Sequence, residues 1–386
     1  MKITIDRKKF LKELEIVGKF VDLKAKGAHN GVFISALENG EAILEAVHNG
    51  KGYDAIKYKV KSTCVNEAGD IFIEFNKLKM LLKSVSANEV ILEDRALKSD
   101  DREIKFEPLS KEELPEYPEI ENAEELYTLP AKELKRLLSD VISAASVPTD
   151  FPKYIGTCLL RSVRGQISAV ATDGKRLAVA KYSCGNIKDD KDLILGSESV
   201  KGLENALEYV NEDVKISVDG PKVWIKSDGV EISTISKNDV NFPSYELIVN
   251  KTVETSLVCR KKDLEEAVKK VYMVAKTTPA RVIGLNFYPG KGAVIAAHSV
   301  KSGDITTTFS KGKIEGKNLM LGVNAQYLLV VLKTLGDAEI IIEFSGEELQ
   351  IRFYRANDIA GLEYLLMPCR LTPADRVLLD IGYPED

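Results

Sequence analysis

The chain has 386 residues, of which 44% are hydrophobic and 29% charged, and its formal net charge is −5. This length exceeds one ordinary hydrophobic core, so we expect several domains. No stretch approaches the roughly 18 consecutive apolar residues of a membrane span, and the N-terminus lacks the apolar region of a secretory signal. We therefore expect a cytoplasmic protein without a membrane span.

One supersecondary pattern occurs three times along the chain. Each copy opens with a short strand that runs into an amphipathic helix, beginning at Ile3, Tyr127 and Thr255. A second strand-to-helix unit follows in each copy, and strands that alternate apolar and polar residues come after it. Helices are predicted over residues 7–20, 76–84, 130–146, 197–210, 260–276 and 324–334.

The copies begin about 125 residues apart, which is the size of one small domain. We therefore predict an α+β protein of three repeated domains, each with two helices packed on antiparallel sheets. The predicted boundaries give domains at 1–126, 127–252 and 253–386. The joins are polar and rich in Pro or Glu: LPEYPEIENAEEL near Leu126, and the stretch around 249–253.

Positive charge is concentrated in the six predicted helices. They carry 19 basic and 10 acidic residues, so the rest of the chain has a net charge of −14. In the first helix Phe10, Leu11, Leu14 and Val17 are expected to be buried, with lysines on another face. Basic helices on an otherwise acidic chain favour binding to a polyanion such as duplex DNA. For a single helix, a merely solvated lysine-rich surface is the better explanation, but a bias summed over six helices is harder to dismiss.

Cysteine and histidine residues are few and scattered. Because no CxxC pair or metal-ligand spacing occurs, we expect no disulfide framework, metal site or cofactor, and we interpret the cysteines as mostly buried hydrophobic residues. The five cysteines and three histidines are Cys64, Cys158, Cys184, Cys259, Cys369, His29, His48 and His298.

The segment 169–181, AVATDGKRLAVAK, breaks an apolar run with a Thr-Asp-Gly turn and two cations. It could form a phosphate-binding loop, a catalytic loop or a hairpin corner. A P-loop requires GxxxxGK[ST] before a helix, whereas a strand is predicted after Arg176. A catalytic Asp173 would need a positioned partner, and none is evident nearby. Asp and Gly favour turns for backbone reasons, so the residues alone favour a structural corner.

Four pieces in order within this repeat carry a resemblance. They are ATDGKRLAVA from Ala171, NFPSYELIV from Asn241, NAQYLLVVLKTLG from Asn324 and YLLMPCRL from Tyr364. Nearly the whole chain, as far as Leu371, resembles the bacterial sliding clamp, the beta subunit of DNA polymerase III. The resemblance implies a non-catalytic processivity factor that encircles double-stranded DNA without sequence preference. It further implies DNA polymerase III, other motif-carrying proteins and a clamp loader as partners.

The resemblance assigns the Thr-Asp-Gly turn to a peptide-binding pocket between the second and third domains. A groove with apolar anchors and a polar rim suits modest, exchangeable binding of short linear motifs. Taken singly, Leu177, Ile248 and Leu366 are each better explained as ordinary core residues. The implied wall comprises Ile155, Thr172, Leu177, Pro243, Ile248, Leu366 and Met367, surrounded by Gly174, Lys175, Arg176, Pro368, Cys369 and Arg370.

Ring closure is the second implied property. Two half-rings would join head to tail as a homodimer, with Ile104 and Phe106 on one edge and Met273 and Val274 on the other, although Phe106 could instead be core. Sliding requires only shallow contacts with phosphates. The candidates for DNA contact are Lys8, Lys12, Lys79, Lys83, Lys132, Lys135, Arg136, Lys262 and Lys269, together with Lys24 and Tyr154, which match DNA-touching loops of the family.

Three features depart from the family pattern. Lys175 stands where His is usual, Cys369 stands where Met is usual, and a C-terminal extension over 372–386 follows Leu371. We expect this tail to cover the groove, add a strand or stay disordered. These departures suggest altered peptide preference, as in a divergent or accessory clamp.

Two alternatives remain open. An enzyme using Asp173, Lys175 and Arg176 would need a pocket with acid-base geometry, whereas a clamp would show an apolar groove. A monomeric DNA- or peptide-binding module that has lost ring closure would be distinguished by its mass in solution.

Overall fold

The computed structural model describes residues 1–23, 30–48, 54–100, 102–113, 116–119, 122–146, 152–248, 252–358 and 361–380. Among these residues, every helix is too short or too polar to span a bilayer. The chain divides into two compact units, residues 1–136 with 162–165 and 184–239, and residues 137–161 with 166–183 and 240–386. The predicted middle domain is shared between them, and the three-domain boundaries stay a prediction.

The first unit holds two antiparallel sheets and helices α1 (Arg7–Val17), α2 (Phe75–Ser84) and α4 (Ser197–Leu207). The first sheet runs β5 (Thr63–Glu67), β1 (Lys2–Asp6), β7 (Glu89–Glu93), β8 (Ala96–Ser99) and β9 (Arg102–Lys105). The second runs β10 (Glu124–Pro130), β15 (Asp213–Asp219), β16 (Lys222–Ser227), β17 (Val230–Ile235), β4 (Asp54–Val60), β3 (Ala42–His48), β2 (Gly31–Ala36) and β6 (Gly69–Glu74). Strand β14 (Lys191–Gly196) leads into α4.

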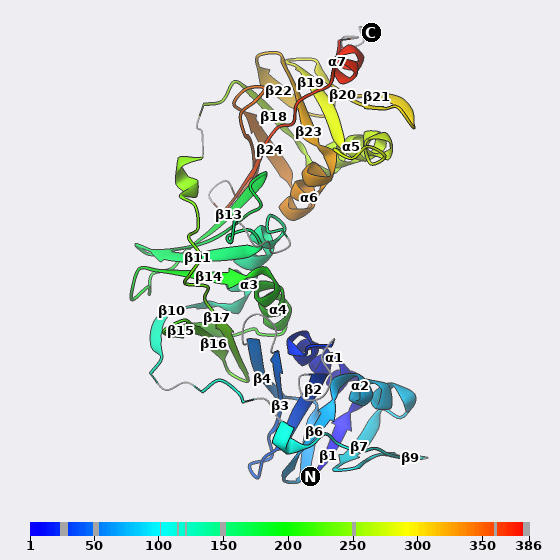
Figure 1. The fold of residues 1–386 in the computed structure, drawn as a ribbon, viewed down its shortest axis with the longest axis vertical. Helices are drawn as coiled ribbons and strands as arrows, with labels where there is room; N and C mark the ends of the chain where they lie inside the picture. The colour runs from blue at the N-terminus through cyan, green and yellow to red at the C-terminus, as the bar shows by residue number, and fades with distance from the viewer. Residues whose placement is uncertain are drawn as a thin grey trace. The chain divides into compact units, whose positions relative to one another are not determined.

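Strands β4 and β17, far apart in sequence, pair within the second sheet (Figure 1). Tyr58 lies opposite Val230, and Ala55 lies opposite Ser233. Asp54 lies at the start of β4. Its carboxylate accepts hydrogen bonds from Thr234 Oγ1 at 2.6 Å and Ser199 Oγ at 2.8 Å. Burial raises the pKa of Asp54. The carboxylate thus ties β4 to β17 and α4.

The second unit holds helices α5 (Lys261–Ala275), α6 (Ala325–Leu335) and α7 (Pro373–Leu379). One run of strands is β11 (Thr157–Val163), β12 (Gln166–Thr172), β13 (Arg176–Ser183), β26 (Leu362–Leu366), β25 (Ile351–Arg355), β24 (Glu339–Phe344), β18 (Thr255–Arg260) and β22 (Lys313–Gly316). A four-stranded sheet runs β21 (Gly303–Phe309), β20 (Gly292–Ser299), β19 (Val282–Tyr288) and β23 (Leu319–Asn324). Helix α3 (Ala131–Ile142) crosses the sequence boundary between the units, and short 3-10 helices are η1 (Gly18–Phe20), η3 (Lys111–Glu113) and η4 (Tyr245–Leu247).

The six predicted helices are α1 to α6, each within a few residues of its expected ends. Capping side chains mark the starts of α1 and α6, and a glycine marks the end of α6. Asp6 accepts a hydrogen bond from the Lys9 amide at the start of α1, and Asn324 accepts one from the Tyr327 amide at the start of α6. Gly336 ends α6 with φ at 73°, a conformation that glycine adopts readily. The predicted stripe of α1 is buried except for Leu11, which is half-buried.

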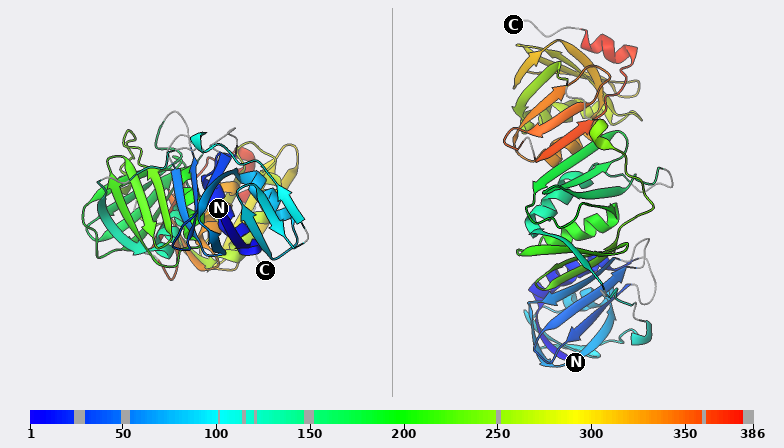
Figure 2. Two further views of the ribbon diagram at one scale, coloured as in Figure 1. Left: turned by 90° about the horizontal axis from the view of Figure 1, so that it is seen from below. Right: turned by 90° about the vertical axis from the view of Figure 1, so that its left-hand side faces the viewer.

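The C-terminal tail corrects our expectation. Over residues 372–380 it neither adds a strand nor lacks structure. Arg376 of this segment lines a hollow together with Pro368, Cys369 and Arg370 of the predicted pocket, and coverage of the groove by the tail stays a prediction. The tail forms α7, whose N-terminus carries a capping box between Thr372 and Asp375. Helix α7 packs on β19 and β20 (Figure 2). Its residue Leu379 is fully buried. Residues 381–386 lie outside the described part of the chain.

Candidate functional site

The Thr-Asp-Gly turn is a hairpin corner between β12 and β13. Thr172 Oγ1 donates to the Arg176 carbonyl at 2.7 Å and accepts from the Gly174 amide at 3.0 Å. Asp173 Oδ1 accepts from the amides of Lys175 and Arg176. Gly174 has a φ of 82°, which only glycine adopts without strain. A strand follows the turn, so the geometry excludes a P-loop.

The segment 366–371 lies directly beside this turn. Arg176 is opposite Leu366 in the pairing of β13 with β26, and the Met367 amide donates to the Lys175 carbonyl at 2.9 Å. Further along, the Cys369 amide donates to the Gly322 carbonyl of β23 at 2.7 Å. The tertiary fold thus brings together two of the four pieces that the resemblance selects.

Arg176 is held in place from several sides. Its Nε donates to Asp173 Oδ2 at 3.0 Å, with both side chains about nine-tenths buried. The guanidinium lies 4.5 Å from the ring centroid of Tyr327 on α6, a cation–π contact. The Asp173 carboxylate is therefore occupied by hydrogen bonds within its own turn.

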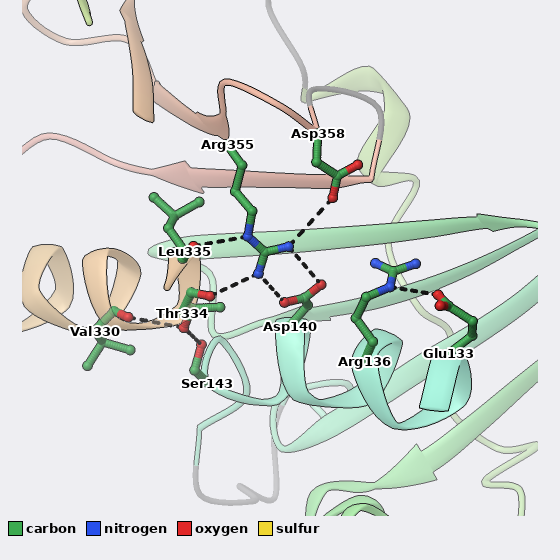
Figure 3. A network of polar contacts seen from close by, with 9 residues as sticks. All are labelled: Glu133, Arg136, Asp140, Ser143, Val330, Thr334, Leu335, Arg355 and Asp358. Carbon is green, nitrogen blue, oxygen red and sulfur yellow. Dashed lines mark hydrogen bonds and ion pairs between the residues drawn. The ribbon is translucent and has the colours of Figure 1, made fainter. Parts of the chain in front are cut away.

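A second polar network fastens α3, α6 and β25 to one another (Figure 3). Arg355 Nη2 donates to Asp140 Oδ1 at 2.7 Å and to the Thr334 carbonyl at 3.1 Å, and Arg355 Nε donates to the Leu335 carbonyl at 3.0 Å. These carbonyls end α6, where a cation is favoured by the helix dipole. Ser143 links this network toward β26, since its Oγ lies 2.9 Å from Thr334 Oγ1 and 3.4 Å from the Tyr364 hydroxyl.

The predicted apolar wall divides by exposure. Leu177 and Leu366 are buried in the sheet, as their alternative interpretation as core residues requires, while Met367 is 40% and Ile248 47% exposed. Ile155 and Pro243 are half-buried. The rings of their sequence neighbours Tyr154 and Phe242 meet edge to face, with 6.1 Å between the ring centroids. The assignment of all these residues to one peptide pocket stays a prediction.

A hollow of about 400 Å³ adjoins the segment 368–371. Its other walls come from β23, from Glu347 and Glu348, and from Arg376 of α7. A larger hollow, about 1050 Å³, lies in the first unit, and Tyr117, which donates to the Glu231 carbonyl, is one of its lining residues. That larger hollow contains none of the predicted site residues.

The candidates for DNA contact differ in their exposure and in their ion pairs with acidic side chains. Lys8, Lys12, Lys83, Lys132 and Lys262 are exposed on their helices. Four other candidates form ion pairs with glutamates of the same chain: Lys79 with Glu15, Lys135 with Glu208, Arg136 with Glu133 and Lys269 with Glu265. Tyr154 is half-buried, and Lys24 lies outside the described residues.

The candidates for dimer contact differ in their exposure, and their assignment to an interface stays a prediction. Strand β9, which contains Ile104, forms one edge of the five-stranded sheet. Phe106 follows it and is buried within the unit, and Met273 on α5 is 65% exposed. Val274 is half-buried.

In the described part of the chain, no group of three or more His, Cys, Asp or Glu residues could hold a metal ion. The sequence reasoning missed Tyr327, Tyr364 and the Arg355–Asp140 pair. Tyr327 and Tyr364 stand within the quoted pieces, but no local pattern shows which distant side chains they meet. Nothing short of the tertiary fold pairs Asp140 with Arg355.

Comparisons with known proteins return the family that the sequence resembles. A family model described as DNA polymerase III beta subunit, central domain, matches residues 128–244. The beta sliding clamp of Bacillus subtilis is 22% identical, covering 96% of this chain and all of that protein. The beta sliding clamp of Lactococcus lactis is 23% identical, covering 96% of this chain and 99% of that protein.

Solved structures agree as well. The DNA polymerase sliding clamp of Bacillus subtilis matches with a TM-score of 0.84 at 20% identity, and the DNA polymerase III beta subunit of Thermotoga maritima with 0.84 at 21%. Each match covers 96% of this chain and 100% of the other. The predicted resemblance to the bacterial beta sliding clamps and the predicted α+β clamp fold are confirmed.

Proposed function

We propose that this chain is a divergent DNA sliding clamp, a ring-forming processivity factor that holds DNA polymerase III and other proteins on duplex DNA. The observation that carries the proposal is the clamp fold over nearly the whole chain, at a TM-score of 0.84. The excess of basic residues on helices of an otherwise acidic chain supports contact with DNA.

Partner proteins would dock through short peptides at the pocket formed around Thr172–Leu177 and 366–370. The contacts between the hairpin corner and Met367 support this placement, because they hold the two segments together before any peptide arrives. The exposed side chains of Met367 and Ile248 would receive apolar anchors, and Lys175 and Arg370 would form part of the polar rim.

DNA contact would use the exposed lysines of the helices, in particular Lys8, Lys12, Lys83, Lys132 and Lys262. Long side chains that meet phosphates in water give weak attraction without reading bases, which permits sliding. Lysines that already pair with a glutamate, such as Lys79 and Lys269, would contribute less.

Ring closure would join two copies head to tail, with β9 of one copy against the α5 end of the other. The open edge of β9 and the exposed Met273 support this arrangement, because closure covers both. A closed ring then requires a clamp loader to open it around DNA. We further propose three domains at 1–126, 127–252 and 253–386, on the strength of the three-fold repeat.

The proposed role is non-catalytic. The enzyme alternative relied on Asp173, Lys175 and Arg176, but the Asp173 carboxylate accepts hydrogen bonds from two amides of its own turn and pairs with Arg176. A structural use of this carboxylate favours the clamp.

The test is sedimentation of the purified protein, followed by loading with a clamp loader onto nicked circular DNA and washing at high salt. A clamp sediments as a dimer and stays on circles, and it is lost once the circle is cut, because only the topology holds it. A monomer released equally from circular and linear DNA would overturn the ring and favour the monomeric binding module.

A further inference from the structure

Arg176 carries a buried N–H group that no protein atom satisfies. Its side chain is only 10% exposed, its Nε donates to Asp173 Oδ2 at 3.0 Å, and its guanidinium lies over the Tyr327 ring. Among the described residues, however, none accepts a hydrogen bond from Arg176 Nη1. A buried donor on a charged group is costly to leave unpaired. Nη1 therefore requires an acceptor that a bound molecule can supply, and Arg176 belongs to the predicted peptide pocket.

Tyr364 meets Arg176 on one face of the sheet. In the pairing of β13 with β26, Arg176 lies opposite Leu366 and Ala178 lies opposite Tyr364. Arg176 and Tyr364 are therefore diagonal neighbours whose side chains point to the same face. Burial raises the pKa of Tyr364. The charge of Arg176 opposes that rise, and so does a hydrogen bond between the two side chains, which agrees with their close contact.

The hydroxyl chain behind Tyr364 has one direction. Thr334 Oγ1 donates its only proton to the Val330 carbonyl at 3.0 Å, so Ser143 Oγ must donate to Thr334 Oγ1 across their 2.9 Å contact. The Ser143 proton is then used, and the Tyr364 hydroxyl donates to Ser143 Oγ across 3.4 Å. Tyr364 keeps its oxygen as an acceptor for Arg176. Figure 3 shows this chain from Ser143 to Val330.

The far end of the hydroxyl chain is rigid. The Thr334 carbonyl accepts from Arg355 Nη2 at 3.1 Å, and Arg355 pairs with Asp140 of α3, with both side chains mostly buried. Thr334 and Ser143 thus link the end of α6 to the segment that follows α3, and neither residue belongs to the predicted pocket. A hydrogen-bonded series with a fixed base holds the side chain at its other end in one orientation. Here that side chain is the guanidinium in the pocket.

We propose that Arg176 Nη1 donates to a main-chain carbonyl of the bound partner peptide. Tyr364, Ser143 and Thr334 act through Arg176, as positioning residues for this bond. The inference rests on the proposed function, because a peptide reaches Arg176 only if it occupies that pocket. A hydrogen bond from a charged donor is stronger than a neutral one. Since every peptide offers main-chain carbonyls, this bond serves all partners alike and leaves the choice among them to the apolar anchors.

The first test measures binding of a fluorescein-labelled peptide with a Leu-Phe anchor pair to the full chain by fluorescence polarisation. Ser143→Ala interrupts the hydroxyl chain outside the pocket, and we expect the peptide to bind about fivefold more weakly. Ser143→Thr keeps a hydroxyl group and should restore binding to within about twofold. The matched control is Ser227→Ala, which removes a half-buried hydroxyl that donates to the Asp213 carbonyl in the first unit and should leave the affinity unchanged.

Combination with Arg176→Gln shows whether Ser143 acts through Arg176. In the Arg176→Gln background, Ser143→Ala should bring no further loss, because the side chain that it positions is absent. Circular dichroism and thermal unfolding establish that each variant is folded. A loss of equal size in both backgrounds would mean that Ser143 only supports the fold, and it would overturn the positioning role.

Peptides with single thioamide substitutions identify the acceptor without a change in the pocket, since sulfur accepts a hydrogen bond more weakly than oxygen. One substituted position should weaken binding to the parent chain about fivefold, and on Ser143→Ala the same substitution should cost less than about twofold. If every position is neutral on the parent chain, Nη1 does not bind the peptide main chain and the inference fails alone. If the unsubstituted peptide does not bind the parent chain, the peptide pocket fails as well.

Discussion

At the residue scale, Arg355 combines several interactions in one guanidinium group. It pairs with Asp140 of α3 and donates to two carbonyls that end α6. The Asp140 side chain is only 7% and that of Arg355 19% exposed, so little water screens the pair. Asp140 lies in the last turn of α3, where the helix dipole disfavours a negative charge, and Arg355 supplies the compensation.

Removing one partner of this pair should be costly. Asp140→Ala leaves a guanidinium largely buried with one fewer acceptor, and we expect the free energy of unfolding to fall by roughly 3 kcal/mol. Urea unfolding followed by circular dichroism measures it. Glu208→Gln breaks the more exposed pair with Lys135 and should cost less than about 1 kcal/mol. Equal effects of the two changes would contradict the importance of burial.

Asp54 should make stability depend on pH. Because burial raises its pKa in the folded chain, the folded state holds the proton more tightly than the unfolded state. Its contribution therefore becomes less favourable as pH rises from the unfolded pKa to the folded pKa, and stays so above it.

An asparagine keeps the shape of Asp54 and removes the charge. Relative to the parent chain, Asp54→Asn should gain stability between about pH 4 and pH 7, because only the parent ionises there. Its amide can still meet the hydroxyls of Thr234 and Ser199. Urea unfolding midpoints of both chains at the two pH values check this, and a constant difference would contradict the raised pKa.

At the element scale, α7 shows how a short helix is held by its neighbours. Seven residues are too few for a helix that is stable alone, so packing must supply the stability. Leu379 is fully buried against Val294 and Ala296, with Leu371, Leu378 and Met320 packed around the cluster. The absence of a side chain at Gly284 makes this contact possible.

A double-mutant cycle tests this fit. Leu379→Ala should cost about 2–4 kcal/mol of unfolding free energy through the cavity it leaves, and Gly284→Ala should also destabilise because its methyl group meets Leu379. In the double variant the new methyl group enters the emptied space, so the loss should be smaller than the sum of the two. Thermal unfolding measures all four chains, and additive losses would show that the two positions do not meet.

At the scale of the whole molecule, self-association decides whether the chain can act as a ring. The proposed interface includes the apolar residue Met273, which is 65% exposed to solvent in the single chain. Burial of such a side chain favours association, whereas a buried unpaired carboxylate opposes it.

Met273→Glu should therefore convert the dimer to a monomer with little effect on folding. Sedimentation velocity at several concentrations measures the mass. The matched control is Val377→Glu on α7, which places the same charge on a side chain that is 67% exposed outside the proposed interface. Loss of the dimer in the control alone, or in neither variant, would contradict the placement of the interface at α5.

The sequence by itself determined the three-fold repeat, helices α1 to α6 and the hairpin character of the Thr-Asp-Gly corner. These features follow from short-range physics: apolar spacing selects helix or strand, and Asp and Gly shape a turn from within it. The resemblance carried by four local pieces supplied the family and its expected function. Each of these signals is contained in a few neighbouring residues.

Tertiary structure alone decided the pairing of β4 with β17, the contact of Arg176 with Tyr327 and the salt bridge between Asp140 and Arg355. It also decided that the tail becomes α7. That helix is held by residues about 90 positions earlier: Gly284 leaves room for Leu379, and Asn286 donates a hydrogen bond to the Leu379 carbonyl. Partners so distant in sequence are chosen by packing and burial, which no local pattern of residues encodes.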